Sequence, residues 1–330
     1  LGAGAGGATL ADGLNPGLSA LGVALYAGSA GTRALRAVSQ DVGLTVAELL
    51  PLVQRWLPSS LYVCGGFECP QAETGSQDGV ASYSAERLHP VLGIWEPLPR
   101  MLQRRAGAAA ATLGGKVYVC GGSNGEVELR TAERFDPLVG AWEPLPPMLH
   151  RKDCAAAAAA AGLLCICGGS RSGLRGAMID DAVECFDPKA SKWAPLASML
   201  QKRVGAAAAC VSGRLYVCGG MEGADDLRSA EALDPAAPGA RWELLPPMRQ
   251  TRYGAAACAL EGRLCVCGGT VNAVAARSAE CFDPVARAWR ALPDMIACRS
   301  GTAAANVAGK LYVCGGKAGR SYLSGAECFD

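Results

Sequence analysis

Basic side chains recur at one position of this 330-residue chain. Five times, an arginine or a lysine follows a methionine at the fourth position beyond it. The planar guanidinium group of arginine donates paired hydrogen bonds to carboxylates and phosphates, so these cations suit the binding of an acidic peptide or a phosphopeptide. We therefore predict a partner-binding ring composed of Arg105, Lys152, Arg203, Arg252 and Arg299, with Tyr253 beside it.

Acidic side chains recur as regularly, and they support a second interpretation. One glutamate stands in each repeat unit, at Glu86, Glu133, Glu184, Glu231, Glu280 and Glu327. One acid for each base at fixed positions is typical of internal salt bridges that tie neighbouring strands together. Repeated positions generally serve the scaffold of a repeat protein, whereas variable positions serve its ligand. Both interpretations of the cations remain open at this point.

Variable insertions provide a second set of candidate binding residues. They occupy residues 67–84, 123–131, 170–181, 221–229, 270–278 and 317–325. The fourth insertion is acidic, with Glu222, Asp225 and Asp226, whereas others are basic or neutral. Mixed charges of this kind favour a polar protein surface as the partner. The predicted contact residues in these insertions are Ser123, Asn124, Arg171, Arg175, Lys317 and Arg320.

The sixteen cysteines do not have the spacing of a zinc site or of an obvious disulfide framework. Cys165 and Cys167 have one residue between them, and so do Cys265 and Cys267, whereas zinc-binding pairs are separated by two or more. Six cysteines occupy one repeat position, before Gly-Gly, and residues related by rotation are not expected to reach each other. We predict buried, reduced thiols, which indicate the cytoplasm or the nucleus.

A repeat of Gly-Gly pairs and tryptophans organises these positions. The pairs begin at Gly65, Gly121, Gly168, Gly219, Gly268 and Gly315, each after a short apolar run that ends in cysteine. Five tryptophans, at 95, 142, 193, 242 and 289, each precede the next pair by 26 residues. The runs read as buried strands, and the glycines permit the turn that leaves each strand. One unit every 47 to 56 residues predicts a propeller or a solenoid.

Alanine-rich runs precede five of the apolar strands, as in residues 155–161. Alanine is the best helix former, so propensity alone predicts helices here. The fixed spacing leaves about eight residues between a turn and the next strand, and the innermost strands of a propeller need small side chains. We therefore predict strands for these runs.

These elements resemble the kelch repeat: an apolar strand ending in Gly-Gly, a strand ending in Phe-Asp-Pro, as at residues 135–137, and a tryptophan followed by Leu-Pro-X-Met. The resemblance covers residues 58–330 and implies an all-β, six-bladed propeller of four-stranded antiparallel blades. The sixth unit lacks its tryptophan strand and the first lacks its alanine strand, so we predict incomplete closure. Either chain beyond Asp330 or residues 39–57 would fill the gap.

The predicted domains are an Ala/Gly/Leu-rich segment of residues 1–57, irregular or partly helical, and the kelch propeller of residues 58–330. In a propeller, the turns that carry the basic residues open on the same face as the insertions. The net charge of +1 gives no indication of nucleic acid or of a membrane as partner. We therefore expect a protein partner on this face.

Kelch resemblance implies a non-catalytic interaction scaffold without a cofactor, of the kind that recognises substrates for cullin-type ubiquitin ligases. Actin-binding and stand-alone scaffold proteins of the family are alternatives. A third alternative is a metalloenzyme similar to galactose oxidase, which uses several histidines and tyrosines at the axis. The chain has only His89 and His150, in different units. A copper or iron site needs more imidazole or carboxylate ligands, so we predict neither a metal site nor catalysis.

Overall fold

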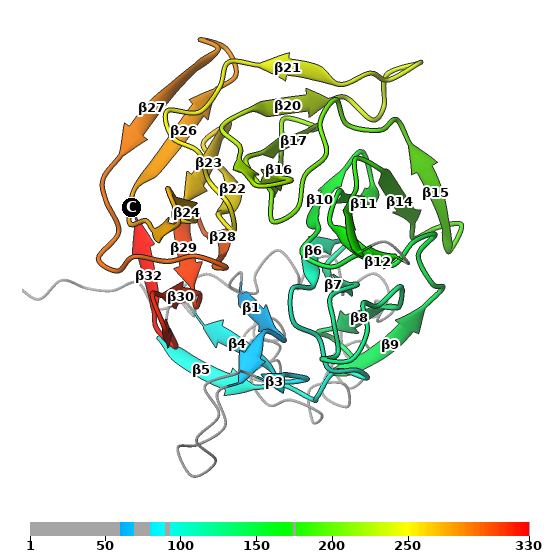
Figure 1. Cartoon of the computed structure of the whole chain (residues 1–330). Helices are drawn as coiled ribbons and strands as arrows, with labels where there is room; N and C mark the ends of the chain where they lie inside the picture. The colour runs from blue at the N-terminus through cyan, green and yellow to red at the C-terminus, as the bar shows by residue number, and fades with distance from the viewer. Residues whose placement is uncertain (1–59, 69–79, 90–92, 174–175, 330) are drawn as a thin grey trace, which may run out of the picture. The chain divides into compact units, whose positions relative to one another are not determined.

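The computed structural model describes residues 60–68, 80–89, 93–173 and 176–329. Contacts divide the chain into two compact units, Leu1–Pro58 with Pro137–Ala141, and Ser59–Asp136 with Trp142–Asp330. The second unit is a ring of six antiparallel β-sheets without a helix among the described residues (Figure 1). This confirms the predicted all-β, six-bladed propeller. The predicted segment of residues 1–57 lies outside the described residues.

Four blades have four strands each, and within each blade the strands are hydrogen-bonded in sequence order from the axis of the ring outward. Blade 2 contains β6 (Ala109–Leu113), β7 (Lys116–Cys120), β8 (Ala132–Asp136) and β9 (Ala141–Leu145). Blade 3 contains β10 (Ala156–Ala160), β11 (Leu163–Cys167), β14 (Val183–Asp187) and β15 (Lys192–Leu196). Blade 4 contains β16 (Ala207–Val211), β17 (Arg214–Cys218), β20 (Ala230–Leu233) and β21 (Glu243–Leu245). Blade 5 contains β22 (Ala256–Leu260), β23 (Arg263–Cys267), β26 (Ala279–Asp283) and β27 (Ala288–Leu292).

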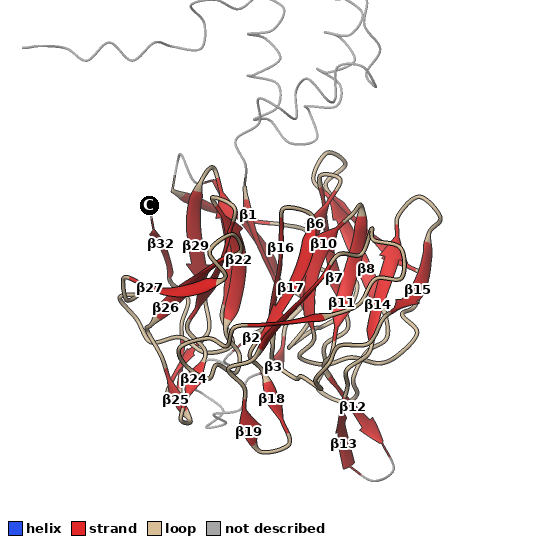
Figure 2. Ribbon diagram, turned by 90° about the horizontal axis from the view of Figure 1, so that it is seen from above, coloured by secondary structure: helices blue, strands red, loops and turns tan. Residues whose placement is uncertain are grey.

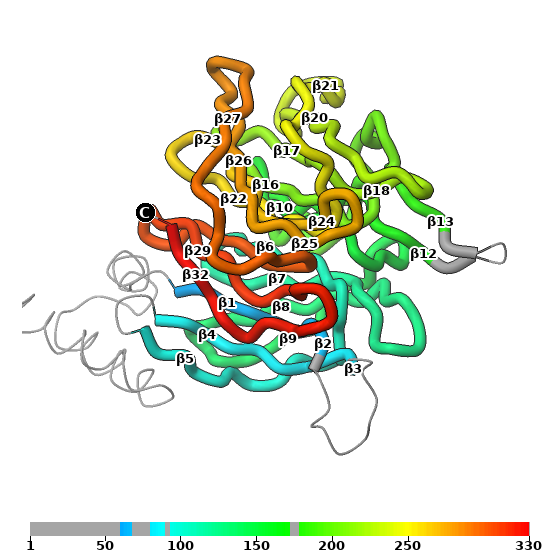
Figure 3. Tube along the Cα trace, turned by 60° about the vertical axis from the view of Figure 1, so that its left-hand side comes forward, coloured from blue at the N-terminus to red at the C-terminus, as the bar shows by residue number. Residues whose placement is uncertain are grey.

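The first and last blades have three described strands each, as the truncated repeat units predict. Blade 1 contains β1 (Leu61–Cys64), β4 (Ala85–His89) and β5 (Ile94–Pro97). Blade 6 contains β28 (Ala303–Val307), β29 (Lys310–Cys314) and β32 (Ala326–Phe329). The traces of the two blades nevertheless lie next to each other (Figure 3). They share an apolar cluster that includes Leu61 and Val307. The ring is therefore closed here by side-chain packing between sheets.

The alanine-rich runs are strands, because they are the innermost strands of the blades. All five residues of β10 are alanines, and β10 pairs with β11 in antiparallel register. Neighbouring inner strands lie side by side around the axis, where only small side chains fit between the converging sheets (Figure 1). Position in the ring thus overrides the helix propensity of alanine.

Tryptophans connect adjacent blades. The indole Nε1 of Trp193, on β15, donates a hydrogen bond of 2.8 Å to the carbonyl oxygen of Pro146 in the preceding blade. Trp142, Trp242 and Trp289 make the equivalent bond at the same distance. The Trp193 ring also packs on Phe186, with the ring centroids 5.2 Å apart. Each such tryptophan therefore fills the gap between two sheets and fixes their separation.

Gly-Gly pairs lie against the turn that leads from one blade to the next. Gly168 has a φ of +62°, and a Cβ there would lie 2.3 Å from the carbonyl oxygen of Arg203. The amide of Gly169 donates to that same carbonyl at 2.8 Å. A side chain at the first glycine would separate the turn from the strand end, so glycine is required there.

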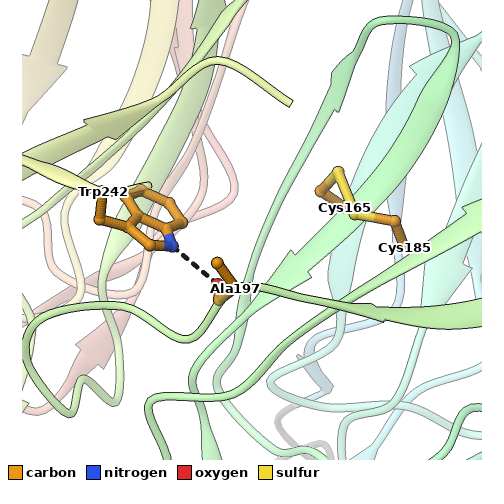
Figure 4. Close-up of a disulfide and its surroundings, with 4 residues drawn as sticks. All are labelled: Cys165, Cys185, Ala197 and Trp242. Atoms are coloured by element: carbon orange, nitrogen blue, oxygen red, sulfur yellow. Dashed lines mark hydrogen bonds between the residues drawn. A yellow bond between two sulfur atoms is a disulfide. The ribbon is translucent and has the colours of Figure 1, made fainter. Parts of the chain in front are cut away.

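One pair of cysteines corrects the prediction that the thiols are all reduced. Cys165 on β11 and Cys185 on β14 form a disulfide, with their Cα atoms 4.2 Å apart (Figure 4). The two residues face each other across neighbouring strands of one blade, whereas the prediction considered only equivalent positions in different blades. Thirteen described cysteines are free, and most of them are buried.

Candidate interaction surface

Insertions after the Gly-Gly pairs form small hairpins on one side of the ring (Figure 2). The hairpins are β2 (Phe67–Glu68) with β3 (Val80–Ala81), β12 (Ser170–Gly173) with β13 (Gly176–Ile179), β18 (Met221–Glu222) with β19 (Asp225–Asp226), β24 (Thr270–Val271) with β25 (Val274–Ala275), and β30 (Lys317–Ala318) with β31 (Ser321–Tyr322). The second insertion is a turn closed by a bridge between Ser123 and Glu128.

The turns that carry the predicted cations lie on this same side. We call the segments 101–105, 148–152, 199–203, 248–252 and 295–299 the methionine turns. The residue after each turn pairs with the start of an insertion, as Val204 does with Met221 and Ser300 with Lys317. The predicted common face therefore exists, and we call the hairpins, the second insertion and the methionine turns together the loop face.

The five repeated cations do not point outward from the loop face. Their exposed fractions lie between 1% and 5%. Arg203, for example, donates from Nε to Glu231 Oε1 at 2.9 Å and from Nη1 to the carbonyl oxygens of Gly219 and Ser229 at 2.8 and 3.1 Å. Because its backbone carbonyl binds blade 3 and its side chain binds blade 4, Arg203 joins two blades.

Glutamates complete this internal network. The second carboxylate oxygen of Glu231 accepts the backbone amide of Leu200 at 2.7 Å, which fixes the methionine turn. The same arrangement joins Arg105 to Glu133, Arg252 to Glu280 and Arg299 to Glu327, with Nε–Oε1 distances of 2.8 Å. This geometry corrects the interpretation of the cations as a partner-binding ring, because their donors are used inside the protein. The cations instead form the internal salt bridges that the second interpretation predicts.

Blade 3 departs from this pattern. Lys152 donates from Nζ to the carbonyl oxygens of Gly168 and Ala182, at 2.9 and 3.1 Å, and lies 3.7 Å from Asp180. Glu184 Oε2 accepts the amide of Leu149, but Glu184 Oε1 is buried and has no hydrogen-bond partner among the described residues. Burial consequently raises the pKa of the Glu184 carboxyl.

Exposed cations stand one position before the buried ones. Arg104, Arg151 and Lys202 are exposed on the methionine turns, and the Nη1 of Arg151 donates to the carbonyl oxygen of Glu128. Each of these turns begins with a buried methionine and ends with a buried cation, while the residues between them are not buried. A ligand on the loop face therefore meets these three side chains rather than their buried neighbours.

Sequence reasoning missed a set of exposed apolar side chains at the position after each methionine. Leu102, Leu149, Leu200 and Ile296 have exposed fractions of 54%, 43%, 60% and 91%. Their backbone amides donate to the glutamates of the internal network, which holds the side chains outward. The sequence already shows an apolar residue at this position in four of the five turns, and this regularity could have identified the exposed apolar set.

The predicted insertion residues have different roles in the structure. Asn124 accepts the amides of residues 126 and 127 through Oδ1, and Ser123 accepts the amide of Gly125, so both stabilise their own turn. Lys317 is exposed and lies 4.9 Å from the ring centroid of Tyr322, and Arg320 is exposed nearby. Arg171 lies half-buried on β12, and Arg175 lies outside the described residues.

Tyr253 lies close to the axis of the ring. Its ring covers Gly205, where an added Cβ would come within 2.4 Å of the ring, and burial raises the pKa of its hydroxyl. Backbone hydrogen bonds of 2.8 and 2.9 Å run from blade to blade at this level, through Gly107, Cys154, Gly205, Gly254 and Gly301. Tyr253 is thus half-buried over a rigid belt, with part of its ring available to a ligand.

An open groove of about 470 Å³ lies on the loop face between blades 3 and 4. Its lining combines two leucines that are each 60% exposed with charged and polar side chains. The lining residues are Asp181, Leu200, Gln201, Lys202, Glu222 and Leu244. Leu244 stands where three other blades have a proline two residues after the tryptophan.

The described residues offer no metal site. They contain no group of three or more histidines, cysteines or carboxylates arranged to hold a metal ion. His89, on β4, lies 3.2 Å from Glu96 on β5, while His150 lies on a methionine turn. In the same described part, no helix is long and apolar enough to cross a membrane.

Comparison with known proteins agrees with this geometry. The kelch motif model matches residues 104–149, 151–200, 202–249, 251–296 and 298–330, which together are more than half of the chain. The chain belongs to the kelch repeat family. The solved structure of YjhT has the same fold, with a TM-score of 0.66 and 13% sequence identity, over 82% of this chain and 94% of that one.

Proposed function

We propose that this chain is a non-catalytic scaffold that binds a partner protein through the loop face of its propeller. The observation that carries the proposal is the set of exposed apolar side chains at one repeated position, Leu102, Leu149, Leu200 and Ile296, beside exposed charged residues. Exposed apolar groups with a polar rim are typical of surfaces that bind proteins. Kelch propellers generally bind proteins, which supports the same conclusion.

The partner segment in this proposal carries acidic groups. Arg104, Arg151 and Lys202 would receive it on the methionine turns, and Lys317 and Arg320 would receive it on the sixth insertion. Tyr253 would contribute an aromatic surface near the axis, while Ser123, Asn124, Arg171 and Arg175 would act from their insertions. The buried cations would hold the turns in place.

The cellular role that we propose is substrate recognition for a cullin-type ubiquitin ligase, in the cytoplasm or the nucleus. It rests on the kelch family and on the thirteen free cysteines. Actin binding or a stand-alone scaffold role is the alternative, and both would use the same face. A metalloenzyme is less favoured, because His89 and His150 stand in different repeat units.

Two substitutions in one blade test the use of the loop face. Ile296→Ser changes a side chain that is 91% exposed at the loop-face end of β27, whereas Val285→Ser changes one that is 96% exposed at the opposite end of β27. Partners would be identified by crosslinking mass spectrometry, with the melting temperature of each variant checked. We expect Ile296→Ser to lose specific partners that Val285→Ser keeps. Equal partner sets for both variants and the wild type would refute the proposal.

A further inference from the structure

We propose that Tyr83, Arg100 and Arg104 form a binding site for the phosphomonoester group of a partner segment, which would be a phosphoserine or a phosphothreonine. The proposal rests on the loop face being the partner-binding surface. It adds the place on blade 1 where that surface would hold an anion.

Two guanidinium groups share one aromatic ring at this site. The Cζ atoms of Arg100 and Arg104 lie 4.6 and 4.9 Å from the centroid of the Tyr83 ring. Arg100 Nη1 also donates a hydrogen bond of 2.9 Å to Tyr83 Oη. Stacking on an aromatic face fixes the plane of a guanidinium group and leaves its edge donors available to a ligand.

The backbone beneath the site is rigid. The amide of Met101 donates to the Tyr83 carbonyl at 2.9 Å, and the amide of Arg105 donates to the Ser82 carbonyl at 2.7 Å. Tyr83 also packs against a buried apolar cluster that includes Met101 and Val119. The Tyr83 ring is therefore anchored. Ligand binding would lose little entropy, because the segment that carries both cations is already ordered.

Among the described residues, no acidic side chain neutralises these two charges. Both arginines are exposed, and neither forms an ion pair with a described acidic residue. Blade 5 provides the contrast, because the positions of Tyr83 and Arg100 are occupied there by Arg277 and Asp294, which pair at 3.0 Å. The repeat thus neutralises this position in one blade and leaves two adjacent positive charges in the other.

The charge of the site selects the class of ligand. A phosphomonoester carries about 1.5 to 2 negative charges at neutral pH and three acceptor oxygens, so one group can compensate both guanidinium ions. A single carboxylate compensates only one of them. We therefore expect phosphate to be preferred over carboxylate by roughly tenfold, which corresponds to about one additional charge-assisted hydrogen bond.

The test uses the full chain and three short probes. They are acetyl-Gly-phosphoserine-Gly-amide and the same peptide with serine or glutamate at its centre. Binding is followed by NMR through the Nε–H signals of Arg100 and Arg104, at constant ionic strength. We expect saturable shifts with the phosphoserine probe, weaker binding of the glutamate probe and none with serine. Equal binding of the phosphoserine and glutamate probes, or no saturation by phosphoserine, would overturn the proposal.

Matched variants separate a built site from diffuse attraction. Arg100→Gln and Arg104→Gln should each weaken phosphoserine binding roughly tenfold or more. Arg249→Gln removes an exposed charge from another methionine turn of the same face and should leave the affinity within about twofold. A similar loss in all three variants would show only general electrostatics and refute the site. If Ile296→Ser loses partners while the phosphoserine probe does not bind the wild-type chain, the proposed function stands and this inference is rejected.

Discussion

The substitution Lys152→Arg should stabilise the propeller. Glu184 Oε1 is buried and has no partner in the part of the chain that the structure describes, whereas the equivalent oxygen in blades 2, 4, 5 and 6 accepts an arginine Nε–H. The four arginines also retain the two backbone contacts that lysine makes, as Arg299 does with Gly315 and Gly325 at 2.7 and 2.9 Å. An arginine at position 152 would therefore add the missing donor and keep the existing ones.

The magnitude follows from the unpaired oxygen. Leaving a buried acceptor without a hydrogen bond costs about 1–3 kcal/mol, and the cost is higher for a charged group. Part of this gain in stability is lost, because Ala182 has no hydroxyl group to accept a hydrogen bond from Nη2, whereas Thr131 provides one in blade 2. We expect a net stabilisation of about 1–2 kcal/mol, which raises the melting temperature of a unit of this size by about 2–6 °C.

The effect should depend on pH. Burial raises the folded-state pKa of Glu184 above its ordinary value of 4.5, so its ionisation destabilises the fold as the pH rises through that raised value. Burial also acts to raise the pKa of Glu327, yet the hydrogen bonds from Arg299 and from backbone amides bring it below 4.5. The advantage of the variant should therefore be full at pH 7 and shrink as the pH falls toward 4.5.

Urea denaturation at pH 7 and at pH 4.5 measures this effect, and Arg203→Lys is the matched control. That variant removes the Nε donor from Glu231 Oε1, and it also removes the hydrogen bond to Ser229 Oγ, so it should lose at least as much stability. The reasoning would be refuted if Lys152→Arg were neutral or destabilising at pH 7. It would also fail if the gain in unfolding free energy were the same at both pH values.

Three further predictions concern the scaffold and its thiols. Trp193→Phe should cost about 1–2 kcal/mol more than Trp95→Phe in urea denaturation, because of these two indoles only that of Trp193 donates an interblade hydrogen bond to a described residue; equal losses would contradict this. Gly168→Ala should destabilise by about 2–4 kcal/mol, since φ is positive and the Cβ meets backbone, and an unchanged melting temperature would refute it. Cys298→Ser should remove one rapidly reacting thiol from the native protein in a disulfide-reagent assay at pH 8, because Cys298 is exposed. An unchanged number of fast thiols would exclude that assignment.

The fold was predictable because its repeat fixes several elements at once. The 26-residue interval between each tryptophan and the next Gly-Gly pair spans the outer strand, the methionine turn and the two inner strands, so no insertion is tolerated there. The interval also identified the alanine runs as strands. Cys165 and Cys185 escaped prediction, because their pairing depends on the register of β11 with β14 and not on the repeat.

The cations show why the site was harder to predict. A charged side chain in a turn is usually exposed, and only three-dimensional contacts reveal that Arg105 and Glu133 bury each other. A signal was present, because 28 residues separate base and acid in four blades. Lys152 and Glu184 are 32 residues apart, which reflects the longer third insertion and accompanies the missing hydrogen bond.

Departures from the repeat are the positions where this scaffold can acquire specific properties. A side chain that recurs in every blade must satisfy the same internal contacts each time, so it is poorly suited to select one ligand. Lys152 departs from the repeat in the interior, where Glu184 Oε1 is left without a hydrogen-bond partner among the described residues. Tyr83 and Arg100 depart on the surface, where water satisfies unused donors and the cost is small. Because a departure on the surface costs little stability, blade 1 can carry side chains that select a ligand without weakening the propeller. This requires that Arg100 and Arg104 form no ion pair with an acidic side chain of the protein.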